Sequence, residues 1–438
     1  MHRHSSFRIS FAGLCAILAL PACGDDTAGS PRHDGGASEA GPAPAIDATA
    51  IDTSVDMGNG TTPMGVVVVN SDYLSSSVSF LDRDGNLLMD GCLNSGSGSP
   101  GLSMTLSGDV VLPTQVPAGG PVAIVDRSNA AITWLDVTTC ASLGQLAVGT
   151  GFASNPHDVV TLSPSKAYVT RQDQNLSATP TPNDFDDGND VLIVDPSLLK
   201  IVGRIDLLPF APTSTAILPR ADRALLAQGR VFVSLNAISA NYASYGLGRV
   251  IIIDPATDQV TGVIDLPGVK NCGAMTYVAE TKRLFVACNG AYGDKAVQAA
   301  GSAIVAIDLE QTPPVVVAQA PAASAGSAPL SNLTVAALDG ATALAVTEGT
   351  LSNTPPDGLW SLPLDGKAPV KIFDSAEGFA IGAVLYDQER HRVLAADGTM
   401  TSSAYLRMFD FSSGGFVAGK PVKTNPTQKL PPRALAFY

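Results

Sequence analysis

Short apolar runs that end in an aspartate recur along this chain, each followed by a turn and a second apolar run. The clearest copies are VLIVDPSLLKIVGRIDL, whose first run ends at Asp195, and VIIIDPATDQVTGVIDL, whose first run ends at Asp254. Looser copies end at Asp82, Asp136, Asp308, Asp365 and Asp410. The copies lie about 45–60 residues apart, which is the length of one blade of a β-propeller. This repeat therefore predicts an all-β fold, a seven-bladed β-propeller.

Each repeat divides into four short strands separated by Gly, Pro, Asn or Asp. In residues 155–208 these strands are HDVVTLS, KAYVTRQ, DVLIVD and KIVGRIDL. Their apolar residues alternate or run continuously, as in strands covered on one or both faces. The folded part opens near residue 64 with three strands, and the chain finishes in PRALAFY. We therefore expect four-stranded antiparallel blades over residues 64–438, with the C-terminal strand completing the first blade and closing the ring.

The repeated aspartate has a structural interpretation and a functional one. At the end of a strand, an aspartate accepts hydrogen bonds from backbone N–H groups two or three residues further on and forms an Asx-turn. In Asp195-Pro196 and Asp254-Pro255 the proline also presets φ for the turn. The alternative is a ring of seven carboxylates that binds a cation. We expect the aspartates to be turn formers.

Three segments resemble the YVTN-type β-propeller repeat of bacterial lipoproteins. They are NPHDVVTLSPSKAYVTR (155–171), GRVFVSLN (229–236) and KRLFVACN (282–289). The resemblance covers most of residues 64–438, is strong in the third to fifth repeats and is weak in the sixth. Lactonase-type propellers are the closest enzymes in fold, and they use a carboxylate and a histidine at the channel mouth. No such set can be matched here residue by residue, and a fold alone does not carry an activity.

The N-terminus has the pattern of a lipoprotein signal. Arg3 and Arg8 precede a short apolar stretch, which indicates a signal peptide over residues 1–22. Its end, Leu-Pro-Ala-Cys23, resembles a bacterial lipobox, and this resemblance implies lipidation of Cys23 and anchoring to a membrane. The alternative is an ordinary secretory signal with a chance cysteine. By the sorting rule of enterobacteria, Gly24 favours the outer membrane, on its periplasmic or surface face.

Residues 23–63 follow as a tether rich in Gly, Ala, Pro, Ser, Thr and Asp. Such a composition buries too little apolar surface to offset the entropy of ordering. We therefore expect a disordered link between the lipidated cysteine and the propeller.

Four further cysteines suggest disulfides in an exported protein. Cys272 and Cys288 are equidistant from a short polar turn, so in a hairpin they would face each other. We predict a Cys272–Cys288 disulfide and, by elimination, a Cys92–Cys140 disulfide.

The charge balance excludes two classes of partner. The chain has 26 Lys and Arg against 40 Asp and Glu, and no basic cluster. Nucleic acids and anionic lipids need clustered Lys and Arg, so neither is expected as a partner.

Motifs for a nucleophile, a P-loop, a dinucleotide or a haem are absent from the sequence. The candidate ligand-binding residues are His157 and Asp158, which enter an innermost strand at one mouth of the channel. The structural alternative is a hydrogen bond from His157 that orients the loop. No cofactor is evident, apart from a candidate calcium loop at Asp184, Asp186, Asp187 and Asp190. Its spacing departs from the EF-hand pattern, and the alternative is a solvated acidic insertion between strands.

These observations favour a cell-envelope lipoprotein whose propeller serves as a binding or interaction platform without catalysis. Loops 170–190, 236–248 and 289–301 would bind an unidentified protein or small molecule at one mouth. The alternative is a lactonase-like hydrolase or lyase that uses His157 with nearby carboxylates, with or without calcium. A purely structural envelope protein is a third, weaker interpretation.

Overall fold

The computed structural model describes residues 62–98, 100–177, 185–212, 216–400 and 404–438. The chain divides into two units, Met1–Ser54 and Val55–Tyr438, and all described residues belong to the second. The predicted signal peptide, Cys23 and nearly all of the predicted tether lie outside the described residues. No helix within the described ranges is long and apolar enough to span a membrane.

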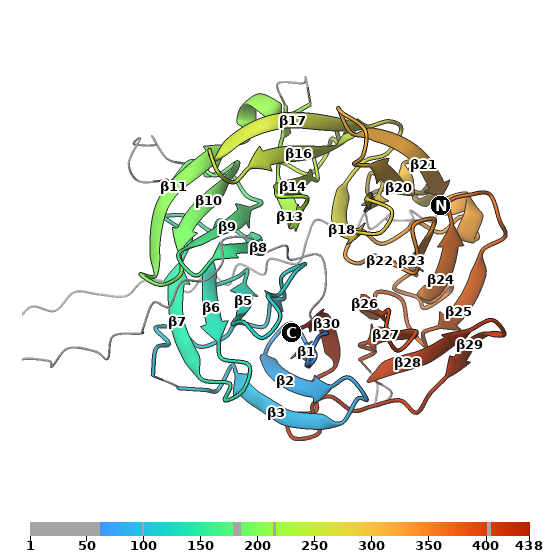
Figure 1. Ribbon diagram of the computed structural model, residues 1–438, viewed down its shortest axis with the longest axis horizontal. Helices are drawn as coiled ribbons and strands as arrows, with labels where there is room; N and C mark the ends of the chain where they lie inside the picture. The colour runs from blue at the N-terminus through green and yellow to red at the C-terminus, as the bar shows by residue number, and fades with distance from the viewer. Residues whose placement is uncertain (1–61, 99, 178–184, 213–215, 401–403) are drawn as a thin grey trace, which may run out of the picture. The chain divides into compact units, whose positions relative to one another are not determined.

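The described residues form seven four-stranded antiparallel sheets arranged as the blades of a ring (Figure 1). This confirms the predicted seven-bladed β-propeller. In each blade one strand lines the channel and the other three follow it outwards. From the innermost strand to the outermost, blade 1 contains β30 (Pro432–Phe437), β1 (Gly65–Ser71), β2 (Ser76–Asp82) and β3 (Leu87–Asn94). Blade 2 contains β4 (Val110–Val111), β5 (Val122–Asp126), β6 (Ala131–Leu135) and β7 (Ser142–Ala147). Blade 3 contains β8 (Pro156–Ser163), β9 (Lys166–Arg171), β10 (Asp190–Asp195) and β11 (Lys200–Asp206).

The remaining blades repeat this order. Blade 4 contains β13 (Ala221–Ala227), β14 (Arg230–Leu235), β16 (Gly248–Asp254) and β17 (Gln259–Leu266). Blade 5 contains β18 (Cys272–Val278), β19 (Arg283–Asn289), β20 (Ser302–Asp308) and β21 (Val315–Pro321). Blade 6 contains β22 (Ala336–Ala337), β23 (Thr342–Thr347), β24 (Gly358–Pro363) and β25 (Val370–Asp374). Blade 7 contains β26 (Ile381–Asp387), β27 (Arg392–Asp397), β28 (Tyr405–Ser412) and β29 (Gly415–Ala418).

A few short elements lie outside the blades. They are the two-stranded pair β12 (Ile217–Leu218) and β15 (Ile238–Ser239), the helix α1 (Lys295–Ala300), and the 3-10 turns η1 (Leu208–Phe210) and η2 (Ala322–Ala325). The side chain of Asp294 caps α1 by accepting hydrogen bonds from the backbone N–H groups of Ala296 and Val297.

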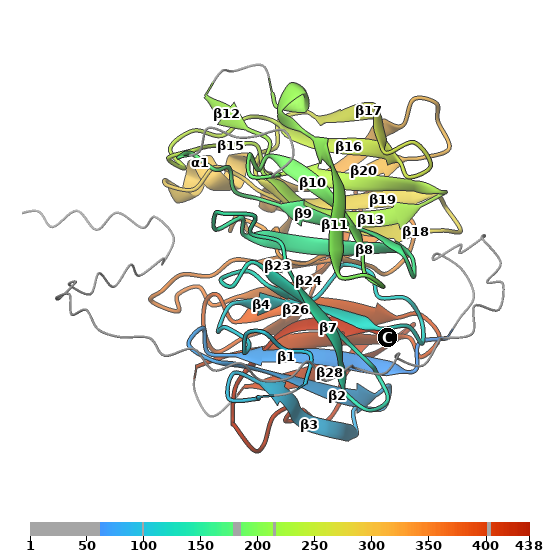
Figure 2. The ribbon, with the colours of Figure 1, turned by 90° about the vertical axis from the view of Figure 1, so that its left-hand side faces the viewer.

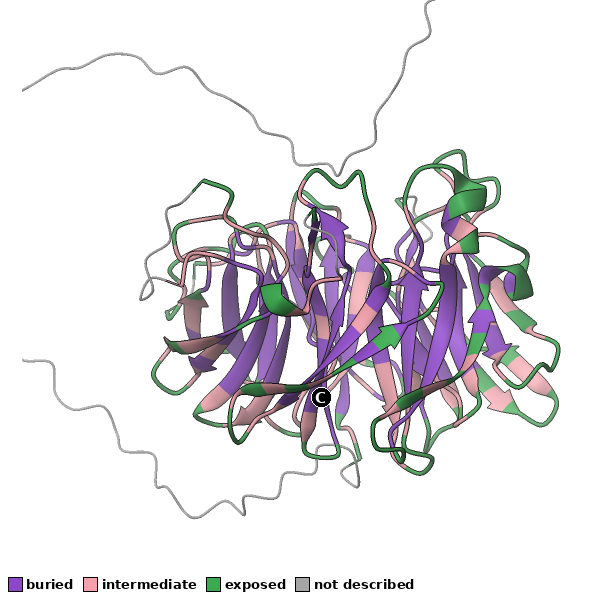
Figure 3. Cartoon of the chain, turned by 90° about the horizontal axis from the view of Figure 1, so that it is seen from above, coloured by how far each residue is buried: buried purple, intermediate pink, exposed green. Residues whose placement is uncertain are grey.

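The hydrophobic core lies between neighbouring blades. Leu225 and Phe232 of blade 4, for example, share one buried cluster with Met275 and Val286 of blade 5. The second and third strands are therefore covered on both faces and read as continuous apolar runs, whereas an outermost strand such as β17 alternates between exposed and buried residues. Figure 3 shows the same gradient, from buried inner strands to partly exposed outer ones.

The ring closes within blade 1 by pairing the two ends of the described chain. β30 pairs antiparallel with β1, from Val66 opposite Phe437 to Val69 opposite Ala434. The Tyr438 ring also packs edge-on against Phe80, with 5.2 Å between ring centroids. The expected closure by the C-terminal strand is confirmed, and it covers the edge that β1 would otherwise expose.

The repeated aspartates form turns at six of the seven positions. Oδ1 of Asp195 accepts from the backbone N–H of Ser197 at 2.9 Å, and Oδ1 of Asp136 accepts from that of Thr139 at 2.7 Å. The corresponding bonds are made by Asp82, Asp254, Asp308 and Asp365. The prediction is wrong only for Asp410, which lies inside β28 and pairs with Nε of Arg392 at 2.7 Å. Because β28 continues two residues beyond Asp410, no turn follows it there.

Both predicted disulfides are confirmed. Cys272 and Cys288 lie directly opposite each other in the β18–β19 hairpin. Cys92 in β3 and Cys140 after β6 join blade 1 to blade 2. Such bonds persist in oxidising compartments.

The two ends of the blades differ in their connections. Pro156 at the start of β8 lies opposite Arg171 at the end of β9, so innermost strands begin where second strands end. We call this end the loop face, because it carries the connections 172–189, 236–247 and 290–301, and the opposite end the hairpin face. In Figure 2, α1, β12 and β15 lie on the loop face and the C-terminus lies on the other side.

Candidate functional site

His157 makes a buried contact between two blades at the loop-face end of the channel. Its Nδ1 lies 2.6 Å from Oδ1 of Asp222, the second residue of β13. The two residues are only 8% and 6% exposed. Burial opposes ionisation of Asp222, but the charge and hydrogen bond of His157, together with the charge of Arg223, outweigh it and lower the pKa of this carboxyl.

Three equivalent positions on consecutive blades meet here. Asn155, Arg220 and Asn271 all have positive φ, and the residues two places further on are His157, Asp222 and Gly273. A Cβ atom on Gly273 would lie 2.5 Å from Oδ2 of Asp222 and 2.6 Å from the carbonyl oxygen of Asn332. A glycine at this position therefore leaves the space that the Asp222 carboxylate needs.

Asparagines at the ends of two second strands connect each blade to the next. Nδ2 of Asn236 donates to Oδ2 of Asp222 at 2.8 Å and to the carbonyl of Cys272 in blade 5 at 2.9 Å. Nδ2 of Asn289 donates in the same way to the carbonyl of Leu330, which precedes blade 6, at 2.6 Å. These two asparagines are the last residues of the repeat segments GRVFVSLN and KRLFVACN. In both segments the final asparagine therefore forms a hydrogen bond that connects its blade to the next one.

One atom of His157 is left without a partner. Its Nε2 is buried and has no hydrogen-bond partner among the described residues. Since Nδ1 faces the Asp222 carboxylate, a neutral imidazole would present the lone pair of Nε2 as an acceptor or a base. The pair thus has the donor–acceptor arrangement of a general base, but both side chains are buried.

Asp158 is directed to neighbours other than Asp222. Its carboxylate accepts hydrogen bonds from the backbone N–H of Thr114 at 2.9 Å, the Thr114 hydroxyl at 2.5 Å and the backbone N–H of Ala224 at 2.9 Å. Burial raises the pKa of Asp158. The residue therefore joins blades 2, 3 and 4, and the structure does not combine it with the His157 imidazole into one binding site.

Two carboxylates of the acidic run 184–190, Asp187 and Asp190, are paired with arginines. Nε and Nη2 of Arg171 donate to the two oxygens of Asp190 at 2.7 and 2.6 Å, and Arg204 pairs with Asp187. Oδ1 of Asp186 is buried with no hydrogen-bond partner among the described residues, and Asp184 lies outside them. Within the described part of the chain no three His, Cys, Asp or Glu residues gather into a group that could hold a metal ion. The sequence pattern suggested a calcium loop without showing these ion pairs, because Arg171 and Arg204 lie outside the run.

Loops from three consecutive blades contact one another on the loop face. The Arg220 guanidinium lies over the Tyr242 ring, 4.2 Å from its centroid, and the Tyr242 hydroxyl donates to Oδ1 of Asp173 at 3.2 Å. The rings of Tyr245 and Tyr292 meet edge-on at 6.4 Å between centroids. Tyr242 and Tyr292 are still 45% and 52% exposed. We call these five residues the loop cluster.

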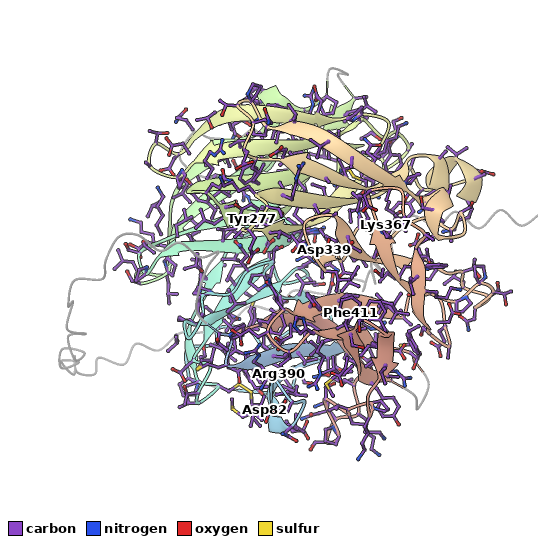
Figure 4. All side chains as sticks on the ribbon, turned by 45° about the vertical axis from the view of Figure 1, so that its right-hand side comes forward. Asp82, Tyr277, Asp339, Lys367, Arg390 and Phe411 are labelled. Carbon is purple, nitrogen blue, oxygen red and sulfur yellow. A yellow bond between two sulfur atoms is a disulfide. The ribbon has the colours of Figure 1, made fainter. Side chains whose placement is uncertain are left out.

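A cavity of about 550 Å³ occupies the channel at the hairpin-face end. Its walls come from the innermost strands of blades 5, 6 and 7, from β30, from Arg223 and from residues 112–114 after β4. Figure 4 shows Tyr277 and Asp339, which contribute to this wall from blades 5 and 6. His157 is not part of the lining.

Sequence reasoning found His157 but missed Asp222 and Arg223. Asp222 lies 65 positions after His157, and neither belongs to a recognisable motif. The signal that could have found it is the alignment of the repeats, since NPHD and PRAD both place a polar side chain two residues after the positive-φ position.

The fold defines the chain as a seven-bladed β-propeller. The sequence matches no protein-family model and no curated protein. A hypothetical selenium-binding protein from Sulfolobus tokodaii has a similar structure, with a TM-score of 0.56 and 10% identity over 88% of this chain and 95% of that one. Candidate 6-phosphogluconolactonases from Bacteroides fragilis and Bacteroides uniformis have TM-scores of 0.54 and 0.53, each at 10% identity. These matches cover 86% of this chain and 98% and 100% of those chains. At such identities the similarity extends to the fold alone.

Proposed function

We propose that this protein is a lipid-anchored component of a bacterial cell envelope whose propeller binds a partner through the loop face. The loop cluster carries this proposal. Loops from blades 3, 4 and 5 are joined there by an ion pair, a cation–π contact and an aromatic contact, yet two tyrosine rings stay half exposed. Pre-ordered, exposed tyrosines provide contact area at a low entropic cost, as they do in binding loops of other proteins.

The envelope location is supported by independent features. The YVTN-type repeat and the lipobox resemble those of exported bacterial lipoproteins, and the two disulfides suit an oxidising compartment. The acidic composition disfavours nucleic acid, so a protein or a glycan of the envelope is the expected partner.

Two experiments test the two parts of this proposal. Cys23→Ser should abolish incorporation of labelled palmitate and move the protein from the membrane to the soluble fraction. A wild-type protein that takes up no label would refute the anchor.

For the loop face, hydrogen exchange of the protein mixed with isolated envelope fractions should show protection in 236–247 and 290–301. A Tyr242→Ser/Tyr292→Ser variant should lose this protection, whereas Tyr277→Ser on the hairpin face should keep it. Equal protection in both variants would refute the loop-face assignment.

The second candidate is a hydrolase or lyase that uses His157 as a general base oriented by Asp222. The 2.6 Å contact and the unpaired Nε2 favour it, and two lactonase candidates share the fold. The burial of the pair is against it, because His157 does not reach the lining of the cavity. Hydrolysis of 6-phosphogluconolactone, abolished by His157→Gln and retained by His391→Gln, would support this candidate. An absence of turnover by the wild-type protein would remove that substrate.

A further inference from the structure

The cavity at the hairpin face is lined by one arginine, by several polar and acidic side chains and by apolar side chains of the innermost strands. Arg223 of blade 4 is part of its lining, and the apolar part of the lining includes Ala274, Leu333, Val335 and Leu385. Leu333 is 56% exposed although it belongs to the channel wall. A volume of about 550 Å³ is within the range of pockets that hold small organic ligands.

Arg223 is fixed before any ligand arrives. Its Nη1 donates to the carbonyl of Leu112 at 3.1 Å and to the carbonyl of His157 at 3.2 Å, which anchors the guanidinium to blades 2 and 3. The side chain is 14% exposed, and Nε lies 3.8 Å from Oδ1 of Asp222. None of the described residues accepts a hydrogen bond from Nη2. One amino group of a pre-positioned, mostly buried guanidinium is therefore left for a ligand.

The rim of the cavity limits what can enter. Glu280, Asp339 and Glu389 lie in the lining at this end, beside Tyr277 and Tyr386. These carboxylates repel a ligand more strongly the more negative charges it carries, so a ligand with a single negative charge suits the attraction of one arginine, Arg223, best. The apolar part of the lining matches an apolar chain or ring.

We propose that this cavity binds a small organic monoanion with an apolar body, whose carboxylate pairs with Arg223. The site is at the opposite end of the channel from the loop cluster, so it adds a small-molecule site to the macromolecular one and does not depend on it. The apolar body packs against Leu333 and its neighbours, and the carboxylate accepts a hydrogen bond from Nη2.

The test uses the purified protein and three defined probes. Octanoate has both parts of the expected ligand, octanol has only the chain and acetate has only the charge. Isothermal titration should show saturable octanoate binding, with octanol and acetate weaker by about tenfold or more. Arg223→Gln should weaken octanoate binding by a similar factor, while Arg230→Gln, which removes the same charge at the start of β14 and outside the cavity lining, should leave it unchanged. Saturable binding should also raise the Tm of the wild-type protein.

Three results would each overturn the proposal by removing the arginine-anchored site. They are a failure of octanoate to saturate the wild-type protein, octanol binding as tight as that of octanoate, and wild-type affinity for octanoate in Arg223→Gln.

A Leu333→Trp variant keeps the proposal testable if Arg223→Gln does not fold. Its tryptophan emission should shift on addition of octanoate and not of acetate, and an unchanged emission would place the ligand elsewhere or nowhere.

Discussion

Nε of Arg83 lies 2.7 Å from Oδ2 of Asp387, although the two residues are 304 positions apart in the chain. Arg83 follows β2 in blade 1 and Asp387 ends β26 in blade 7. Nη1 of Arg83 also donates to Oε2 of Glu389 at 2.7 Å. The seam between the first and last blades is thus held by a buried ion pair in addition to the pairing of β1 with β30.

Breaking this ion pair should strongly destabilise the propeller. The Arg83 and Asp387 side chains are 5% and 2% exposed, so Arg83→Met leaves the buried carboxylate with only the more distant Arg390, 3.9 Å away, and should cost about 3 kcal/mol. Arg127→Met is the control, because the Arg127–Asp109 pair is partly exposed and should be worth about 1 kcal/mol or less. Denaturant unfolding measures both. Equal losses in the two variants would contradict a special role for the seam.

Removal of the last strand should open the ring. Deletion of residues 434–438 removes most of the ladder to β1 and uncovers Val66 to Val69, which are fully buried. We expect loss of several kcal/mol of stability and an increased tendency to self-associate through the exposed edge. Thermal unfolding and size-exclusion chromatography report these effects. A soluble monomer with an unchanged Tm would show that the strand is dispensable.

Replacement of Asp158 should be more damaging than replacement of a turn aspartate. The Asp158 oxygens accept hydrogen bonds from three backbone N–H groups and one hydroxyl. In an Asp158→Asn variant one of these oxygens becomes an NH₂ group, which is itself a donor and would oppose the donors that now bind the carboxylate. We expect a loss of about 2 kcal/mol or more in the free energy of unfolding. Asp195→Asn keeps an acceptor oxygen at an exposed turn and serves as the matched control, with a much smaller effect.

Asp222 should contribute to acid sensitivity. Its folded-state pKa is lower than the ordinary value of 3.8, so the native state binds fewer protons than the unfolded state in the window below about pH 4. The stabilisation is present above this window and is lost as the pH falls through it. The free energy of unfolding, measured at pH 6 and at pH 3, should fall less in Asp222→Asn than in the wild-type protein. An identical fall in both proteins would contradict the lowered pKa.

Much of the architecture could be predicted because it depends on short sequence patterns that recur in each blade. The spacing of the aspartates gave the number of blades, the unpaired PRALAFY strand gave the closure, and the symmetry of Cys272 and Cys288 about a turn gave a disulfide. The turn predicted at Asp410 is absent because β28 continues two residues beyond this aspartate.

The candidate sites could be predicted only in part. His157 stands out in the sequence, but its partner Asp222 is set by the packing of one blade on the next. The ion pairs of Asp187 and Asp190 could not be predicted for the same reason, because Arg171 precedes the acidic run and Arg204 follows it on other strands of the blade. Arg223 belongs to no motif, and only the channel geometry shows that its Nη2 has no acceptor among the described residues.

The order of the strands has a consequence for how the protein is made. β30 follows every other strand in the chain but is required by the first blade. While the polypeptide is being synthesised, blade 1 lacks its innermost strand, so the ring cannot close until the last strand has been made.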